Sequence, residues 1–233
     1  DDGGSGYSVT GIHRGKGGTA GAPSEAKTAD GRVFSSGDRV GLLVDMGART
    51  LAIYRNGAPI PGLTFTGLPA EVYVGATPDD RGASVRIEQK ALPAQAAAAP
   101  RAAAASGMQW STTAKGSAIE LADGGAVARN NTGSYGHSVC SASPLPSSGV
   151  HYVELVYEKG SKGCNMGGCY MTGVLSAEAA KRTGVFSQKY GLAEMADGFW
   201  GVDDGGHSGA NSGIRHGKGG TAGAPSEAKT ADG

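Results

Sequence analysis

The sequence predicts an all-β protein, an antiparallel sandwich or barrel with glycine-rich turns. Short apolar runs recur about every 10 to 15 residues, which is the spacing of antiparallel strands joined by turns. Asn56-Gly57 directly follows one of these runs, and this dipeptide tolerates the positive φ of a tight hairpin turn. No stretch shows the apolar periodicity of a long helix. These three observations favour strands throughout the chain.

Four strands are predicted in the N-terminal part. Arg39–Asp45 and Thr50–Arg55 are short apolar runs, and Met46–Arg49 turns the chain between them. Val72–Ala76 and Ala83–Glu88 complete the set. Strands at this spacing are typical of an antiparallel sheet.

An alanine- and proline-rich stretch follows. Residues 91–106 read ALPAQAAAAPRAAAAS. Alanine favours helix, but Pro100 interrupts the stretch, which has no apolar face that could dock on a core. A packed core helix is the alternative. We interpret residues 92–107 as a linker between two parts, residues 1–91 and residues 108–233.

The C-terminal part contains the strongest predicted strand, Val150–Tyr157. We expect it to pair with the next apolar run, Cys169–Leu175, and we expect a further short strand at Gly198–Val202. Ser176–Arg182 is predicted to form a single helical turn with Ser176 as its N-cap. This part is therefore also β-rich.

The two ends of the chain carry the same segment. Residues 15–31 and 217–233 are identical in all seventeen positions, and residues 1–31 match residues 203–233 at 23 of 31 positions. The offset, 217 − 15 = 202 residues, is longer than the repeats of solenoid proteins. We interpret it as the period of a tandem array of whole domains with linkers. The chain is then expected to begin and end inside a unit of a longer protein.

The ordered motifs resemble the SPRY domain, the core of the B30.2 family. In the N-terminal part the resemblance lies in Ser36–Asp45, Leu51–Gly57, Phe65–Pro69, Val72–Gly75 and Ala83–Ile87. In the C-terminal part it lies in Trp110, Ser148–Glu154, Gly173-Val174 and Gly198–Val202, with Val153 where the family has tryptophan. The resemblance covers all but the linker, and it implies an antiparallel β-sandwich.

The family's closing half precedes its opening half in this chain. Residues 1–91 resemble the C-terminal part of one unit, and residues 108–233 resemble the N-terminal part of the next. Either the chain is a piece of a tandem array, or its two parts close into one circularly permuted sandwich. In the second arrangement residues 203–233 are a surplus copy. We expect a neighbouring subunit to accept that copy in a filament-forming contact.

Cys164 and Cys169 flank a four-residue turn between two predicted strands, where a disulfide is feasible. Reduced cysteines are one alternative. A zinc site completed by Cys140 or His137 is another, although the CxxC spacing typical of such sites is missing. Asn130 begins an Asn-Asn-Thr tripeptide, which is a glycosylation acceptor only in a secreted protein.

Sequence motifs for catalysis are missing. Gly15-Lys16 lacks both the preceding glycine and the following Ser or Thr of a phosphate-binding loop, and there is no GxSxG elbow. Lys plus Arg and Asp plus Glu number 21 each, without the basic cluster that nucleic acid would need. No apolar run reaches the about 18 residues of a membrane span. We expect a non-enzymatic protein without a catalytic residue, metal or cofactor.

The resemblance implies a protein-interaction module whose loops form the binding face. Candidate interaction residues in the counterpart loops and the repeated segment are Lys16, Thr19, Asp79, Asp80, Arg81, Lys218 and Thr221. The leading interpretation is a structural repeat protein whose units contact neighbouring copies in a larger assembly or filament. The alternative is an adaptor whose sandwich loops capture a peptide motif of a partner. Cytoplasmic, ciliary and extracellular locations all stay open.

Overall fold

The computed structural model describes the chain in segments. These are residues 12–14, 19–20, 33–78, 81–93, 107–132, 137–159, 170–182, 184, 186–187, 192, 198–203, 215–216 and 220–221. Cys164, Cys169, Asp79, Asp80, Lys16, Lys218 and most of the predicted linker lie outside the described residues.

Strands make up most of the described residues. In the N-terminal part they are β1 (Ile12–Arg14), β2 (Thr19–Ala20), β3 (Arg39–Asp45), β4 (Thr50–Arg55), β5 (Ala58–Thr66), β6 (Val72–Pro78) and β7 (Ser84–Lys90). In the C-terminal part they are β8 (Trp110–Lys115), β9 (Ile119–Ala122), β10 (Val127–Asn130), β11 (Val139–Ser141), β12 (Val150–Lys159), β13 (Tyr170–Ser176), β14 (Phe199–Asp203), β15 (Arg215–His216) and β16 (Gly220–Thr221). A 3-10 turn spans Asp123–Gly125, and α1 spans Ala177–Ala180.

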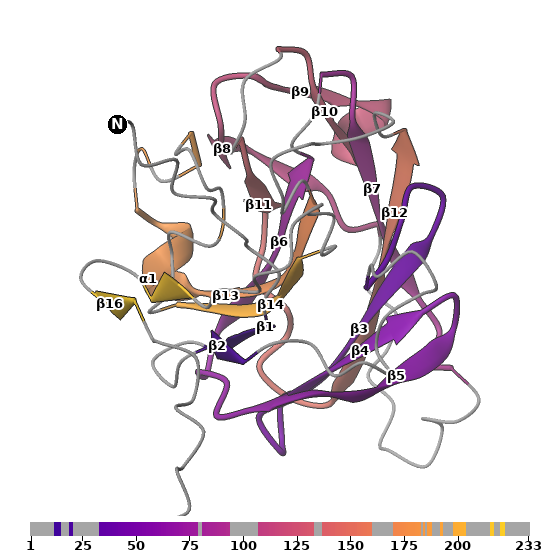
Figure 1. The fold of residues 1–233 in the computed structure, drawn as a ribbon, viewed down its shortest axis with the longest axis vertical. Helices are drawn as coiled ribbons and strands as arrows, with labels where there is room; N and C mark the ends of the chain where they lie inside the picture. Colours follow the sequence, from indigo (N-terminus) through magenta and orange to yellow (C-terminus); the bar gives the residue numbers. More distant parts are fainter. Residues whose placement is uncertain are drawn as a thin grey trace, which may run out of the picture.

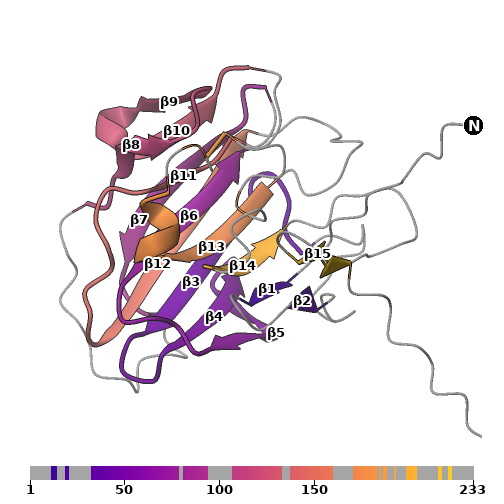
Figure 2. The ribbon, with the colours of Figure 1, turned by 90° about the vertical axis from the view of Figure 1, so that its left-hand side faces the viewer.

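The described strands form two antiparallel sheets that pack face to face, which confirms the predicted β-sandwich (Figures 1 and 2). Sheet A has the strand order β2-β1-β14-β13-β6-β11-β8, and sheet B has the order β5-β4-β3-β12-β7-β10-β9. A separate two-stranded sheet joins β15 and β16. The sandwich therefore contains strands from both parts of the chain.

Strands of the two parts alternate within each sheet. In sheet B, β12 lies between β3 and β7, with Val153 opposite Leu42 on one side and opposite Gln89 on the other. In sheet A, β6 lies between β13 and β11. The described strands from β3 to β7 and from β8 to β14 therefore build one sandwich together rather than one each.

One predicted pairing is wrong. Val150–Tyr157 and Cys169–Leu175 were expected to be partners, but β12 belongs to sheet B and β13 to sheet A. β12 pairs with β3 and β7 instead, while β13 pairs with β14 and β6. The two strands are neighbours in the sequence, yet each pairs with the N-terminal part of the chain, β12 with β3 and β7 and β13 with β6.

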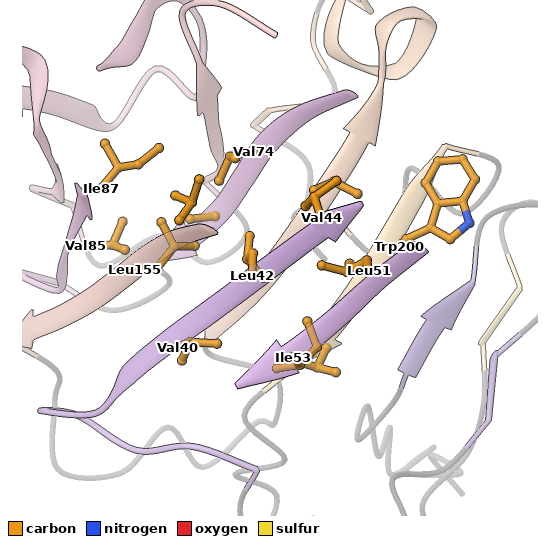
Figure 3. Packing of buried hydrophobic residues seen from close by; sticks show 14 of the residues in the cluster. Val40, Leu42, Val44, Leu51, Ile53, Val74, Val85, Ile87, Leu155 and Trp200 are labelled. Atoms are coloured by element: carbon orange, nitrogen blue, oxygen red, sulfur yellow. The ribbon is translucent and has the colours of Figure 1, made fainter. Parts of the chain in front are cut away.

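The core lies between the sheets and is made of alternate side chains. Val40, Leu42 and Val44 of β3 face inward, as Figure 3 shows beside residues from the neighbouring strands. Val153 is fully buried in this cluster at the position where the SPRY pattern has tryptophan. Burial of this many large apolar side chains is the main favourable term in folding, at about 25 cal/mol per Å².

Two polar aromatic groups tie the sheets together through the core. The indole Nε1 of Trp110 on β8 donates to the carbonyl of Val85 on β7, at 3.2 Å. The hydroxyl of Tyr157 on β12 donates to the carbonyl of Met171 on β13, at 3.0 Å. The ring of Tyr157 also lies 5.2 Å from that of Phe34 and 4.7 Å from that of Tyr170, centroid to centroid. Both hydrogen bonds satisfy buried polar groups that would otherwise be costly.

A second apolar layer covers the outer face of sheet A. Its buried members are Cys140, Met171, Leu175, Ala179, Ala180, Phe186, Leu192 and Phe199. Beneath it, Gly75, Gly173 and Gly201 stand side by side on β6, β13 and β14. A Cβ on Gly173 would come within 2.8 Å of the Phe199 ring, so the glycine row makes room for this layer.

Local signals end the strands as predicted. Asn56 and Gly57 both have positive φ, 52° and 83°, in the turn between β4 and β5. The side chain of Asp45 accepts hydrogen bonds from the backbone of Gly47 and Ala48, which closes the turn between β3 and β4. The hydroxyl of Ser176 caps α1 by accepting from the backbone of Ala179 at 3.1 Å.

Candidate functional site

The first candidate site is the edge of sheet A at β14. β1 pairs with it antiparallel, with Ile12 opposite Val202, His13 opposite Gly201 and Arg14 opposite Trp200. β2 then pairs with β1 and ends the sheet. The N-terminal copy of the repeated segment therefore supplies the last two strands of sheet A.

The C-terminal copy forms the same hairpin. Arg215 pairs with Thr221 and His216 with Gly220. With the repeat offset of 202 residues, Arg215 corresponds to His13 and Thr221 corresponds to Thr19. His13 and Thr19 pair with each other in the N-terminal copy. Both copies thus adopt one register, although only the first is part of the sandwich.

The predicted interaction residues fall in different places. Thr19 lies in β2 and Thr221 in β16, where they hold equivalent positions of the two hairpins. Arg81 is exposed in the turn before β7. The other four, Lys16, Asp79, Asp80 and Lys218, lie outside the described residues. Of the seven predicted interaction residues, Thr19 and Thr221 are therefore the two that occupy equivalent positions in the two copies of the repeated segment.

A second candidate site is a hollow at the opposite edge of sheet A. Between β11 and β8, Val139 is opposite Lys115 and Ser141 is opposite Trp110, so that Cys140 alone faces the four residues 111–114. The hydroxyl of Ser111 accepts from the backbone of Thr113 at 3.2 Å and of Ala114 at 2.9 Å, which holds this bulge. A bulge generally bends the strand that carries it.

We call the hollow beside this bulge the β8 groove. Its volume is about 520 Å³. Its walls are the bulge of β8, residues 140–142 at the end of β11, Tyr73 of β6 and the described residues between Ala180 and Ser187. Lys115, Lys181 and Arg182 line it, and Lys115 Nζ donates to the carbonyl of Ile119 at 2.6 Å. Sequence reasoning missed this groove, because its residues come from four separate segments and share no motif.

The Cys140 thiol forms part of the floor of the β8 groove and is 1% exposed. Burial raises its pKa to about 12, because the apolar surroundings disfavour the thiolate. His137 is also buried, and burial lowers the pKa of its imidazole. Among the described residues, no three His, Cys, Asp or Glu side chains gather where they could hold a metal ion.

Asn130 is a structural residue in the folded chain. It is fully buried, and its Nδ2 donates to the carbonyl of Pro78 at 3.1 Å. Its Oδ1 accepts from the backbone of Thr132 at 3.0 Å. The side-chain nitrogen that would carry a glycan is therefore buried in the fold and hydrogen-bonded there.

His151 is likewise part of the framework. It is 2% exposed, and its Nε2 donates to the carbonyl of Ser148 at 2.8 Å, just before β12 begins. This hydrogen bond fixes the approach to the central strand of sheet B.

No family model matches the chain, and neither does any curated protein or solved structure. The SPRY-like assignment therefore stays a prediction from the sequence, while the sandwich architecture is shown by the structure. None of the helices in the described part of the chain is long and apolar enough to cross a membrane.

Proposed function

We propose that this chain is a non-enzymatic interaction module, a SPRY-like repeat unit that assembles with neighbouring copies of itself. The observation that carries the proposal is the identical register of the two hairpins, β1–β2 and β15–β16. One of them is seated on β14, and the other is available in the same molecule.

The surplus hairpin has a physical reason to dock. An isolated two-stranded hairpin is marginally stable in water, and it gains stability when a sheet edge pairs with it. The β14 edge already accepts the sequence Ile-His-Arg of β1, and residues 214–216 of the other copy read Ile-Arg-His. We infer that the C-terminal hairpin of one copy takes the place of β1 and β2 on the β14 strand of the next copy, where β1 is seated in the single chain. Such a contact is heterologous and propagates into chains.

The repeated segment allows a matched test. Thr221→Pro removes a backbone donor and disfavours the strand in the C-terminal copy, and Thr19→Pro makes the same change in the N-terminal copy. Sedimentation equilibrium over a range of protein concentrations measures the mass of each variant. We expect the parent chain and Thr19→Pro to associate, and Thr221→Pro to be monomeric with an unchanged Tm.

The proposal fails if the parent chain has the mass of a monomer at every concentration. It also fails if Thr221→Pro associates as strongly as the parent. Either result would leave the adaptor interpretation, in which the sandwich captures a peptide of a different protein.

A further inference from the structure

We propose that the β8 groove is a second, independent binding site, and that it takes an acidic peptide segment of another protein. The groove does not overlap the site of the proposed self-association. In sheet A, β14 stands near one end of the strand order and β8 at the other end. The two sites can therefore be tested separately.

The charge of the groove selects the class of ligand. Lys115 approaches it from β8, while Lys181 and Arg182 approach it from the end of α1. No Asp or Glu is among the described residues that line it. The described ion pairs lie on or beside sheet B instead, where Arg39 is 3.0 Å from Glu154 and Lys90 is 2.8 Å from Glu88. Among the described residues no ion pair involves the three cations of the groove, so they can meet a carboxylate.

The groove also offers hydrogen bonds and an apolar floor. Hydroxyls of Thr113, Ser117 and Ser187 line it, and Cys140 and Phe186 lie buried at its base. Its volume of about 520 Å³ lies within the range of pockets that hold small ligands or a few side chains. A short segment with acidic residues on both sides of a single aliphatic residue matches this arrangement.

Nucleic acid fits the groove less well than a peptide. Three cations neutralise few phosphates, and phosphate contacts dominate the affinity for nucleic acid. Besides Phe186, the described residues that line the groove include one other aromatic side chain, that of Tyr73. The hydroxyl of Tyr73 donates to Glu71 at 3.0 Å. A carboxylate at that position repels a phosphate backbone, whereas a peptide can place its acidic residues on the Lys181 side.

Fluorescence anisotropy tests the proposal with the full chain and two labelled peptides. One is a short Glu- and Asp-containing peptide around a single leucine, and the other has the same sequence with Gln and Asn. We expect the acidic peptide to bind more tightly than its neutral analogue, and the binding to weaken as ionic strength rises. The variant K181Q/R182Q should lose about tenfold in affinity.

A matched control removes two positive charges elsewhere. Lys90 and Arg129 are both exposed, and K90Q/R129Q should bind the acidic peptide as the parent does. Thr113→Trp fills the groove without changing its charge, and it should abolish binding while the circular dichroism spectrum stays that of the parent. Sedimentation of K181Q/R182Q should also match the parent, which separates this site from the self-association site.

Four results would overturn the proposal. They are equal binding of the neutral peptide, unchanged binding by K181Q/R182Q, loss of binding in K90Q/R129Q, and tighter binding of a labelled oligonucleotide than of the peptide. The third result would move the peptide site to sheet B, which carries Lys90 and Arg129, and the fourth would change the ligand class.

Discussion

The ring of Tyr152 lies across Gly41 on the face of sheet B that is turned away from sheet A. A Cβ on Gly41 would stand 2.6 Å from two ring carbons of Tyr152, closer than real side chains approach. Tyr152 is 4% exposed, and its ring makes an edge contact with Tyr54 at a centroid distance of 5.7 Å. An aromatic side chain can therefore be buried outside the main core because one glycine leaves room for it.

The Gly41→Ala substitution should lower the free energy of unfolding by about 1–3 kcal/mol, because the added methyl group displaces a packed ring. Urea denaturation measures this change. Gly107→Ala is the matched control, since a Cβ there meets nothing within 4 Å, and its effect should stay within about 0.5 kcal/mol. In a Tyr152→Leu background the Gly41→Ala effect should shrink; an unchanged effect would show that the ring is not its cause.

The glycine row of sheet A gives a graded prediction. A Cβ on Gly173 would meet the backbone of Gly201 at 2.6 Å, whereas the nearest atoms to one on Gly75 are side-chain atoms of Leu175 and Leu192, at 3.0 and 3.1 Å. Gly173→Ala should therefore cost more than about 2 kcal/mol, and Gly75→Ala about 1 kcal/mol or less. Thermal unfolding of the two variants measures the order, and the reverse order would contradict the packing described for this face.

The hydroxyl of Tyr157 gives a test of the link between the sheets. Tyr157→Phe leaves the buried carbonyl of Met171 without this donor, so it should lower the free energy of unfolding by about 1–2 kcal/mol. Tyr73→Phe removes a hydroxyl that bonds to the exposed Glu71, and it should have an effect of less than about 0.5 kcal/mol. Chemical denaturation of both variants measures the difference. Equal effects would mean that the hydrogen bond to Met171 contributes nothing.

Cys140 should react slowly with thiol reagents. Its thiol is buried and its pKa is raised to about 12, so the reactive thiolate is scarce at neutral pH. Iodoacetamide labelling followed by mass spectrometry of tryptic peptides should show little modification of Cys140 in the native protein. Labelling in urea is the control, and there Cys140 should be modified readily. Rapid native labelling would contradict the burial.

The same thiol predicts a pH dependence of stability. The folded pKa is about 12 and the ordinary value is 9.0, so the folded state keeps a proton that the unfolded state releases. The contribution of the Cys140 thiol to the free energy of unfolding is complete below about pH 9 and is lost as the pH rises toward 12. The stability of the parent should therefore fall more steeply across this interval than that of Cys140→Ala. Parallel curves for the two proteins would sink the prediction.

Much of the sandwich could be predicted from local patterns. β3 and β4 coincide with the predicted strands at both ends, because an apolar alternation and the Asn56-Gly57 turn both act locally. β5 was not predicted, since Pro59, Pro61 and Gly62 lie inside it and disfavour a regular strand. As an outer strand of sheet B, β5 tolerates prolines that a central strand would not.

Pairing between strands and the β8 groove could not be predicted in this way. β12 has two partners that lie in the other part of the chain, and no local signal distinguishes them from β13. β8 consists largely of Ser, Thr and Ala, so its apolar signal is weak. Its bulge depends on the hydroxyl of Ser111, and a serine in a sequence does not reveal which backbone groups it will bind.

The insertion of β12 between β3 and β7 determines when this protein can fold. Val40 pairs with Leu155, which lies 155 − 40 = 115 residues later, so the hairpins of the N-terminal part leave the ribosome before their central partner exists. Long-range pairing of this kind slows folding, because the closure of a large loop precedes any gain in contacts. By the same connectivity, a protease cut between residues 93 and 107 would leave two fragments held together by strand pairing and by their shared core. Such fragments should separate only when the sandwich itself unfolds.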